Sequence, residues 1–211
     1  MSNIKVVSLD IEGTMITPDF SRAVWYNGVS TLYAKRYRIS FEEATATVVK
    51  EYEEVGDQRL EWYDIKYWFQ CFQFGDYWKV LEEHKHQVAC YPELSEALHS
   101  LGKDNTLIAI TSSTREFLPY LLTDIEDHFT RIFSSISDYS QLKTPSFYLT
   151  ICQEMGISPH EMAHIGDNWQ FDFLMAREAG VKTFHIERRD ELKNEESLTS
   201  LIEVKTRLQD K

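Results

Sequence analysis

Short hydrophobic runs rich in β-branched residues recur along this chain, and each stops at a polar residue or a glycine. The first run covers 4–9 and ends abruptly at Asp10 and Gly13, a pattern typical of a buried strand that stops at a loop. Later runs of the same kind predict four more strands. These strands cover 107–110, 131–133, 162–165 and 182–186.

Segments with the hydrophobic spacing of amphipathic helices separate the later strands. The predicted helices cover 92–101, 115–122, 146–155 and 170–179. Gly102, Gly156 and Gly180 stand where the C-caps of three of them are expected. Because strands alternate with helices, we predict an α/β fold whose core is a Rossmann-like, three-layer arrangement of a parallel sheet covered on both faces.

The segment 16–88 interrupts this alternation, because it has several helical patterns in succession and no convincing strand. Ser40 and Glu43 form a capping-box signature before a helix that runs to about residue 54. Most of the many aromatic side chains in this segment are expected to fill a small helical core, and one or two to face a site. Further helices are predicted at 20–37, 58–73 and 76–87. We therefore predict a core domain of residues 1–15 and 89–211, with an inserted α-helical domain of residues 16–88.

Composition and charge narrow the classes of function. The 211 residues are 43% hydrophobic and 27% charged, as in an ordinary globular protein, and no apolar run approaches the roughly 18 residues of a membrane span. The first residues lead directly into a strand and not into a secretory signal, so we expect a cytoplasmic protein without a membrane partner. The formal net charge of −12 argues against nucleic acid as a partner. The three scattered cysteines, Cys71, Cys90 and Cys152, are expected to be buried free thiols.

Polar residues follow the predicted strands at the end where the active site of an open parallel sheet lies. Acids, a hydroxyl and a lysine gathered there would form an oxygen-rich site of mixed charge, suited to magnesium and a phosphate group. These residues are Asp10 and Glu12 after the first strand, Thr111 at the end of the second, Lys143 after the third, and Asp167 and Asp172 after the fourth.

Each of these residues alone has a simpler explanation. An acid before a glycine is often part of a turn, and Asp172 alone fits the solvated face of a helix. Thr111 alone fits a helix N-cap, and Lys143 alone fits a solvated surface lysine. Their joint occurrence, in order and at strand ends, favours a shared site.

The four motifs together resemble those of the haloacid dehalogenase (HAD) superfamily, in the order of that family. The matching strings are Asp10-x-Glu12-Gly13-Thr14, the strand that ends in Thr111, Lys143-x-Pro145, and Gly166-Asp167 followed by Asp172. The resemblance spans essentially the whole predicted core. It implies that the inserted segment 16–88 is the α-helical cap of the family, which closes over the substrate.

The resemblance implies a phosphatase that acts on a small phosphorylated metabolite and depends on Mg²⁺. Asp10 would be the nucleophile and would form a transient aspartyl-phosphate. Thr111 would hydrogen-bond the phosphoryl oxygens, and Lys143 would neutralise the charge that these oxygens gain.

The resemblance also implies a ligand set for the metal. The carboxylates of Asp10 and Asp167 and the backbone carbonyl of Glu12 would hold Mg²⁺, together with waters and a phosphate oxygen. Asp172 would steady the metal-binding loop or a metal-bound water.

Two positions depart from the pattern of the family, and they leave other functions open. Glu12 stands where the family usually has Asp, and Thr144 follows Lys143 where Pro commonly follows directly. Glu12 keeps an acid with a longer reach, so general acid–base catalysis remains possible. The string 10–14 also resembles the corresponding motif of enolase-phosphatases of methionine salvage. Further alternatives are a 2-haloacid dehalogenase-type hydrolase, against which Glu12 argues, and a catalytically silent binding protein on this fold.

Overall fold

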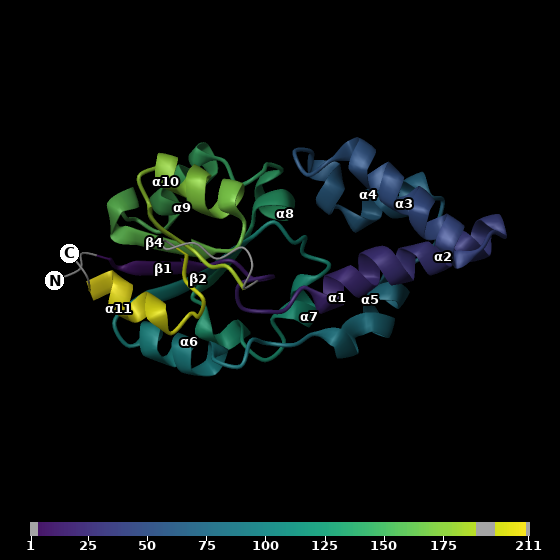
Figure 1. Ribbon diagram of the computed structural model, residues 1–211. Coiled ribbons are helices and arrows are strands. Elements are labelled where there is room, and N and C mark those ends of the chain that lie inside the picture. The colour runs from purple at the N-terminus through teal and green to yellow at the C-terminus, as the bar shows by residue number, and fades with distance from the viewer. Residues whose placement is uncertain (1–3, 189–196, 210–211) are drawn as a thin grey trace.

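The computed structural model describes residues 4–188 and 197–209 and has a five-stranded, entirely parallel sheet at its centre (Figure 1). The remaining parts of the predicted core domain, 1–3, 189–196 and 210–211, lie outside the described residues. All five predicted strands are present. They are β1 (Val6–Leu9), β2 (Thr106–Thr111), β3 (Arg131–Ser134), β4 (Met162–Gly166) and β5 (Lys182–His185).

The strands follow the order β3-β2-β1-β4-β5, so β1 lies in the middle of the sheet. The chain passes from β1 to β2 and β3 on one side, and then crosses to β4 and β5 on the other side. Ligands of open α/β sheets bind where the strand order reverses in this way, beyond the carboxyl ends of the strands. The topology therefore directs attention to the residues that follow β1, β2 and β4.

Alternate residues of the strands face two separate hydrophobic clusters, as the period of two along a strand requires. Val7 and Leu9 of β1 pack with α6 (Leu94–Gly102) and α11 (Glu203–Gln209). Val6 packs with α9 (Pro145–Glu154) and α10 (Met175–Glu178) on the opposite face. Figure 1 shows these two helical layers on either side of the sheet. The predicted three-layer α/β fold is confirmed.

The helices of the core mostly follow the predicted ranges. They are α6 (Leu94–Gly102), α7 (Leu118–Leu121), α8 (Ser135–Tyr139), α9 (Pro145–Glu154), α10 (Met175–Glu178) and α11 (Glu203–Gln209), with short 3₁₀ or π segments η4 (Glu126–His128), η5 (Pro159–Glu161) and η6 (Trp169–Leu174). The helix predicted at 115–122 is shorter than expected. Arg115, the first residue of the predicted range, lies outside the helix. Its backbone N–H donates to Ser137 Oγ at 2.9 Å, and its guanidinium pairs with Asp138.

The segment between β1 and α6 is helical throughout its regular structure and extends to one side of the sheet (Figure 1). The capping box at Ser40 and Glu43 is present at the start of its longest helix. The elements are α1 (Asp19–Arg22), η1 (Ala23–Gly28), α2 (Val29–Tyr37), α3 (Phe41–Val55), η2 (Leu60–Tyr63), α4 (Ile65–Cys71), α5 (Trp78–His84) and η3 (Lys85–Gln87).

A single helix over 58–73 was a wrong prediction. The chain forms the 3₁₀ turn η2, becomes extended at Asp64 (φ −97°, ψ 105°), and then begins α4. The cause is local, because the Asp64 carboxylate accepts a hydrogen bond from Lys66 N at 2.9 Å and so caps a new helix. This break places Tyr63 at a bend and not on a regular helix face.

The two connections between the helical segment and the rest of the protein lie next to each other. Thr17 N donates to Ala89 O at 2.8 Å, and Tyr91 N donates to Met15 O at 3.0 Å, so the two connections run side by side. The boundaries 15/16 and 88/89 of the two predicted domains stay a prediction. Cys71, Cys90 and Cys152 are free thiols as expected, but only Cys152 is buried and the other two are exposed. Within the described residues, no helix has the length and apolar character needed to cross a bilayer.

Candidate active site

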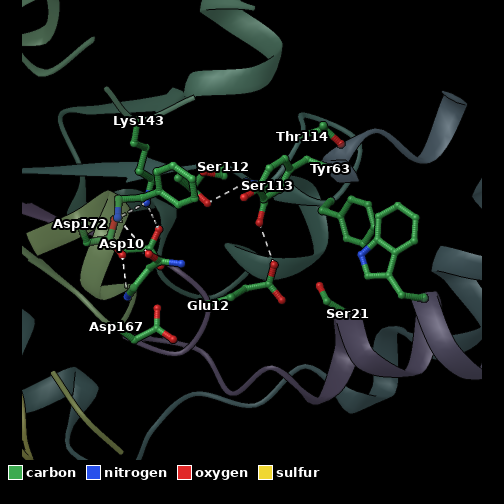
Figure 2. Close-up of a pocket in the computed structure, with 15 residues that line it drawn as sticks. Asp10, Glu12, Ser21, Tyr63, Ser112, Ser113, Thr114, Lys143, Asp167 and Asp172 are labelled. Atoms are coloured by element: carbon green, nitrogen blue, oxygen red, sulfur yellow. Dashed lines mark hydrogen bonds and ion pairs between the residues drawn. The ribbon is translucent and has the colours of Figure 1, made fainter. Parts of the chain in front are cut away.

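The carboxyl ends of β1, β2 and β4 open into one pocket. All six side chains that the sequence singles out line it, together with residues of the helical segment (Figure 2). Asp10 directly follows β1, Thr111 ends β2 and Asp167 directly follows β4. Lys143 reaches the pocket from the loop before α9, and Asp172 from η6.

Lys143 is buried, with 3% of its side chain exposed, and bridges two carboxylates. Its Nζ donates to Asp10 Oδ1 at 2.5 Å and to Asp172 Oδ1 at 2.6 Å. Burial lowers the pKa of Lys143, but the charges of the two carboxylates outweigh burial and raise this pKa above its usual value. Lys143 is therefore a fixed cation inside the site and not a solvated surface lysine.

The surroundings of Asp10 work against its ionisation. Burial raises the pKa of this carboxyl well above its usual value, the ammonium of Lys143 lowers it, and the charges of Asp172 and Asp167 raise it further. A carboxyl that is to act as a nucleophile must be ionised. The site thus calls for positive charge beyond that of Lys143.

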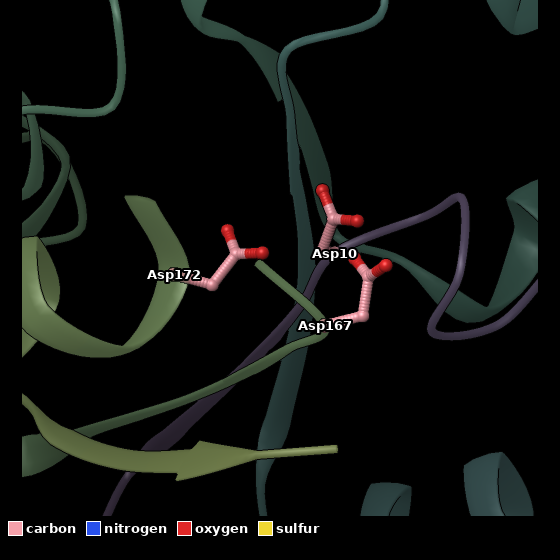
Figure 3. A group of neighbouring side chains, drawn as sticks. All are labelled: Asp10, Asp167 and Asp172. Carbon is pink, nitrogen blue, oxygen red and sulfur yellow. The ribbon is translucent and has the colours of Figure 1, made fainter. Parts of the chain in front are cut away.

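Three carboxyl groups gather where such a charge would lie. Asp10, Asp167 and Asp172 each offer an oxygen, and these oxygens lie within 4.8 Å of one another (Figure 3). Asp167 faces solvent, yet the protein around its carboxyl raises its pKa to about 7, and the charge of Asp172 contributes. Hard divalent cations prefer such carboxylate oxygens and would relieve this repulsion, so the donor set fits Mg²⁺.

Asp172 is fixed by contacts on both of its oxygens. Oδ2 accepts from Asn168 N at 3.0 Å, and Oδ1 lies 3.2 Å from Nε2 of the buried His164, whose Nδ1 is 2.8 Å from Ser8 Oγ. Burial raises the pKa of Asp172, but Lys143 and His164 more than offset it and keep this pKa below its usual value. Asp172 therefore stays ionised and ties the loop after β4 to Lys143.

Two glycines allow the loops to approach this closely. Gly13 has φ +76°, and a Cβ on it would lie 2.1 Å from Asp167 Oδ2. A Cβ on Gly166 would lie 2.3 Å from Asp172 Cγ. A larger residue at either position would displace an acid of the site.

The side chain of Glu12 turns away from the three clustered acids (Figure 2). Its Oε2 accepts from Ser113 Oγ at 2.7 Å, and its buried Oε1 has no hydrogen-bond partner among the described residues. Burial raises the pKa of Glu12, although the hydroxyls of Ser21 and Ser113 lower it in part. A buried acid of this kind retains a proton more readily than a solvated one. The binding of metal by the backbone carbonyl of Glu12 stays a prediction.

Thr111 does not cap a helix. Its Oγ1 accepts from Ser113 N at 3.0 Å, which shapes the loop after β2, and the next α-helix, α7, begins only at residue 118. The hydrogen bond from Thr111 to a phosphoryl oxygen stays a prediction.

Ser21 and Tyr63 of the helical segment line the pocket but were not predicted from the sequence, and neither was the buried His164 behind the acids. Trp25 is one of the aromatic residues of the helical segment, of which one or two were expected to face a site, and Ser113 is one of the polar residues that follow the second predicted strand. The spacing of Ser21 and Trp25, four residues apart, places them on one helix face and is a signal that the sequence contains. Nothing in the sequence indicates that this face meets the strand ends.

Comparisons with known proteins agree with this architecture. A curated relative, the phosphoglycolate phosphatase of Chromobacterium violaceum, is 27% identical over 193 residues, which cover 85% of this chain and 83% of the relative. Among solved structures, an HAD phosphatase from Thermococcus onnurineus superposes with a TM-score of 0.86 at 23% identity over 98% of both chains. A 2-haloacid dehalogenase from Pseudomonas syringae superposes with a TM-score of 0.67 at 18% identity over 96% of this chain and 97% of that one. Both likenesses concern the fold alone.

The family profile described as haloacid dehalogenase-like hydrolase matches residues 4–180, which include all four motifs and the whole helical segment. The resemblance noted from the motifs is therefore confirmed. The chain belongs to the family of haloacid dehalogenase-like hydrolases.

Proposed function

We propose that this hydrolase is a Mg²⁺-dependent phosphatase of a small phosphorylated metabolite, and that it acts through an aspartyl-phosphate on Asp10. The observation that carries the proposal is the division of the pocket around Asp10. On one side lie Lys143 and the acids Asp167 and Asp172, whose charges suit a cation and a phosphate. On the other side stands Glu12, a separate buried acid with a raised pKa.

In the first step, a carboxylate oxygen of Asp10 attacks phosphorus while the bond from phosphorus to the ester oxygen breaks. The leaving oxygen takes the proton of Glu12, whose raised pKa favours the protonated form that this step requires. Lys143 holds Asp10 Oδ1 at 2.5 Å, which leaves Oδ2 free of this contact and available for the attack. The products are an alcohol and a phosphorylated Asp10.

In the second step, Glu12 is ionised and takes a proton from water. The water oxygen attacks phosphorus, the bond from phosphorus to Asp10 breaks, and inorganic phosphate leaves. The proton returns to Glu12 and the carboxylate to Asp10, so the residues end as they began. Ser113 donates to Glu12 Oε2 and keeps this carboxyl on the side of the pocket near the helical segment.

Asp10, Asp167 and the backbone carbonyl of Glu12 would hold Mg²⁺, with Asp172 supporting the loop. When bound, the ion neutralises the charge on the phosphoryl oxygens and favours the ionised form of Asp10.

The position of Glu12 favours phosphate ester hydrolysis over the alternatives. A dehalogenase releases halide, which needs no proton, so Glu12 would not be needed as a general acid. A silent binding protein has no need for a buried lysine that bridges two acids, because burying such charges is costly. The Chromobacterium relative, named a phosphoglycolate phosphatase, supports a small phosphate monoester as the substrate. The alternative of an enolase-phosphatase is supported only by the sequence of residues 10–14.

The test is phosphate release from a panel of phosphate monoesters and from 2-chloropropionate, each with Mg²⁺ and with EDTA. We expect phosphate release that requires Mg²⁺ and no chloride release. Chloride release that is indifferent to EDTA would instead identify a dehalogenase, and the absence of both reactions would argue for a binding protein.

Asp167→Asn is expected to weaken Mg²⁺ binding at least roughly 10-fold, because it removes an anionic oxygen ligand. Isothermal titration with Mg²⁺ measures this directly, and excess Mg²⁺ should restore part of the activity. Asp138→Asn, which removes an acid outside the pocket, serves as the control. An unchanged Mg²⁺ affinity in Asp167→Asn would refute this ligand.

Glu12→Gln is expected to slow the hydrolysis of esters with poor leaving groups by roughly 100-fold, because the amide donates no proton to the leaving oxygen. Esters with good leaving groups, such as 4-nitrophenyl phosphate, need little protonation and should lose less in the first step. Burst kinetics separate this step from hydrolysis of the phospho-enzyme. If both classes of ester reacted as fast as with the parent enzyme, Glu12 would have only a structural role.

A further inference from the structure

The wall of the pocket formed by the helical segment is aromatic and held in place by several contacts. The indole of Trp25 stacks on Phe117 of the core, with ring centroids 5.5 Å apart and planes at 23°. The ring of Tyr52 meets Trp25 edge-on at 5.9 Å, and the Tyr52 hydroxyl donates to Trp25 O at 3.2 Å. Trp25 is therefore a fixed surface on the substrate side of the pocket.

Tyr63 adds a second aromatic ring to the lining of the pocket. Its hydroxyl donates to Asp57 O at 3.1 Å and is thus already engaged within the helical segment. Phe171, from η6, contributes a further ring. Beside these rings, the buried hydroxyl of Ser21 lies close to Glu12 and lowers the pKa of that acid (Figure 2). This part of the pocket offers aromatic faces and neutral hydroxyl groups.

The charges of the pocket are mainly negative. Its described lining contains four acids and one lysine, and the lysine already pairs with Asp10 and Asp172. Arg22, the neighbour of Ser21, lines a second, adjoining cavity with Tyr91 and Arg188 and not this pocket, although Glu12 and Asp167 line both. A second anionic group on the substrate would thus face Glu12, aromatic rings and neutral hydroxyls, and the described lining has no further lysine or arginine to pair with it.

We infer that the substrate is a phosphate monoester of an uncharged alcohol with an apolar or aromatic body. The inference rests on the proposed phosphatase function and extends it to the leaving group. The phosphate would lie beside Lys143, the ester oxygen beside Glu12 and Ser21, and the body of the alcohol against Trp25 and Tyr63. Small-molecule sites are commonly built in this way, with apolar walls and a few polar groups that fix orientation.

The test compares two pairs of esters in which one member carries a carboxylate on the alcohol and the other does not. The first pair is 2-hydroxyethyl phosphate and phosphoglycolate, and the second is benzyl phosphate and 4-carboxybenzyl phosphate. We expect the carboxylate to lower kcat/KM roughly 100-fold within each pair. We also expect benzyl phosphate to exceed 2-hydroxyethyl phosphate by roughly 10-fold, because its ring packs against the aromatic wall. Equal or better turnover of the carboxylated esters would overturn the inference.

A variant with a cation in the pocket tests the electrostatic argument by itself. Tyr63→Lys is expected to reduce the penalty for the carboxylate at least roughly 10-fold in the pair of benzyl esters. Tyr37→Lys adds the same charge on an exposed face outside the pocket and should leave the ratio unchanged. A ratio that stays the same in folded Tyr63→Lys would contradict the inference. If Tyr63→Lys does not fold, Trp25→Leu should abolish the preference for benzyl over 2-hydroxyethyl phosphate, and an intact preference there would contradict the inference equally.

The two proposals fail in different ways. If none of these esters, nor 4-nitrophenyl phosphate, is hydrolysed in a reaction that requires Asp10, the phosphatase function fails and the inference fails with it. If the esters are hydrolysed and the carboxylated members are preferred, the phosphatase function stands and only the uncharged leaving group is wrong.

Discussion

Replacement of Asp10 by asparagine is expected to lower kcat for phosphate release by roughly 10⁴-fold or more, because an amide is a poor nucleophile. The amide is nearly isosteric with the acid, and its oxygen can still accept the hydrogen bond from Lys143 Nζ. Lys143 also keeps Asp172 as an ionic partner, so the fold should survive. The measurements are the steady-state rate and the capture of a phosphorylated protein after acid quench, which should be seen only in the parent enzyme.

The matched control is Asp104→Asn, since Asp104 is an exposed acid on the surface of the core, paired with Lys205. This variant should retain the rate of the parent and its phosphorylated form. Turnover at the parental rate in Asp10→Asn would exclude the covalent mechanism. A phosphorylated form that persists in Asp10→Asn would instead place the nucleophile elsewhere.

Replacement of Lys143 by methionine is expected to lower the free energy of unfolding by about 3–5 kcal/mol, besides abolishing activity. Methionine has a similar length but no charge, so the buried carboxylates of Asp10 and Asp172 would face each other without their shared cation. Removal of one partner from a buried ionic cluster costs more than the cluster itself contributes, because the remaining charges stay desolvated. Urea-induced unfolding measures the loss.

Lys5→Met provides the comparison for an exposed lysine. Lys5 pairs with Glu161 at 2.5 Å, but 61% of its side chain is exposed, and such pairs contribute less than about 1 kcal/mol. Lys143→Met combined with Asp172→Asn should recover part of the stability, because it removes one of the two opposed charges. If Lys143→Met unfolded at the same urea concentration as Lys5→Met, the buried ion pairs of Lys143 would contribute no more to stability than the exposed ion pair of Lys5.

Much of the site was predictable because its residues sit next to strands. A buried strand is visible as a short apolar run, and in a parallel sheet the carboxyl ends of the strands meet at one edge. This rule alone predicted that Asp10, Thr111 and Asp167 lie close together, as they do in the pocket. Lys143 and Asp172 lie farther from their strands, so the same rule indicated them less directly, and their place in the motifs of the family supported it.

Local chemistry also fixed some ends of helices and left others ambiguous. The capping box of Ser40 and Glu43 acts within four residues, so the sequence alone predicted the start of α3. The pattern over 58–73 did not reveal the break at Asp64, because aspartate serves equally well on a helix surface and as a cap. Arg115 shortened α7 through partners in β3 and α8 that no local pattern shows.

By itself, the sequence of this protein determined the strands, the parallel sheet, most of the helices between β1 and α6 and the set of acids at the strand ends. Hydrophobic periodicity over a few residues reveals the elements, and the alternation of strands with helices implies parallel pairing. The tertiary structure alone decided the burial of Lys143, the turn of Glu12 toward Ser113 and the aromatic wall of Trp25. The contact between Lys143 and Asp10 joins residues 133 positions apart, and that between Ser113 and Glu12 joins residues 101 apart. Contacts of such separation depend on how whole elements pack, and packing is what sets the burial, the charge state and the direction of each side chain in this pocket.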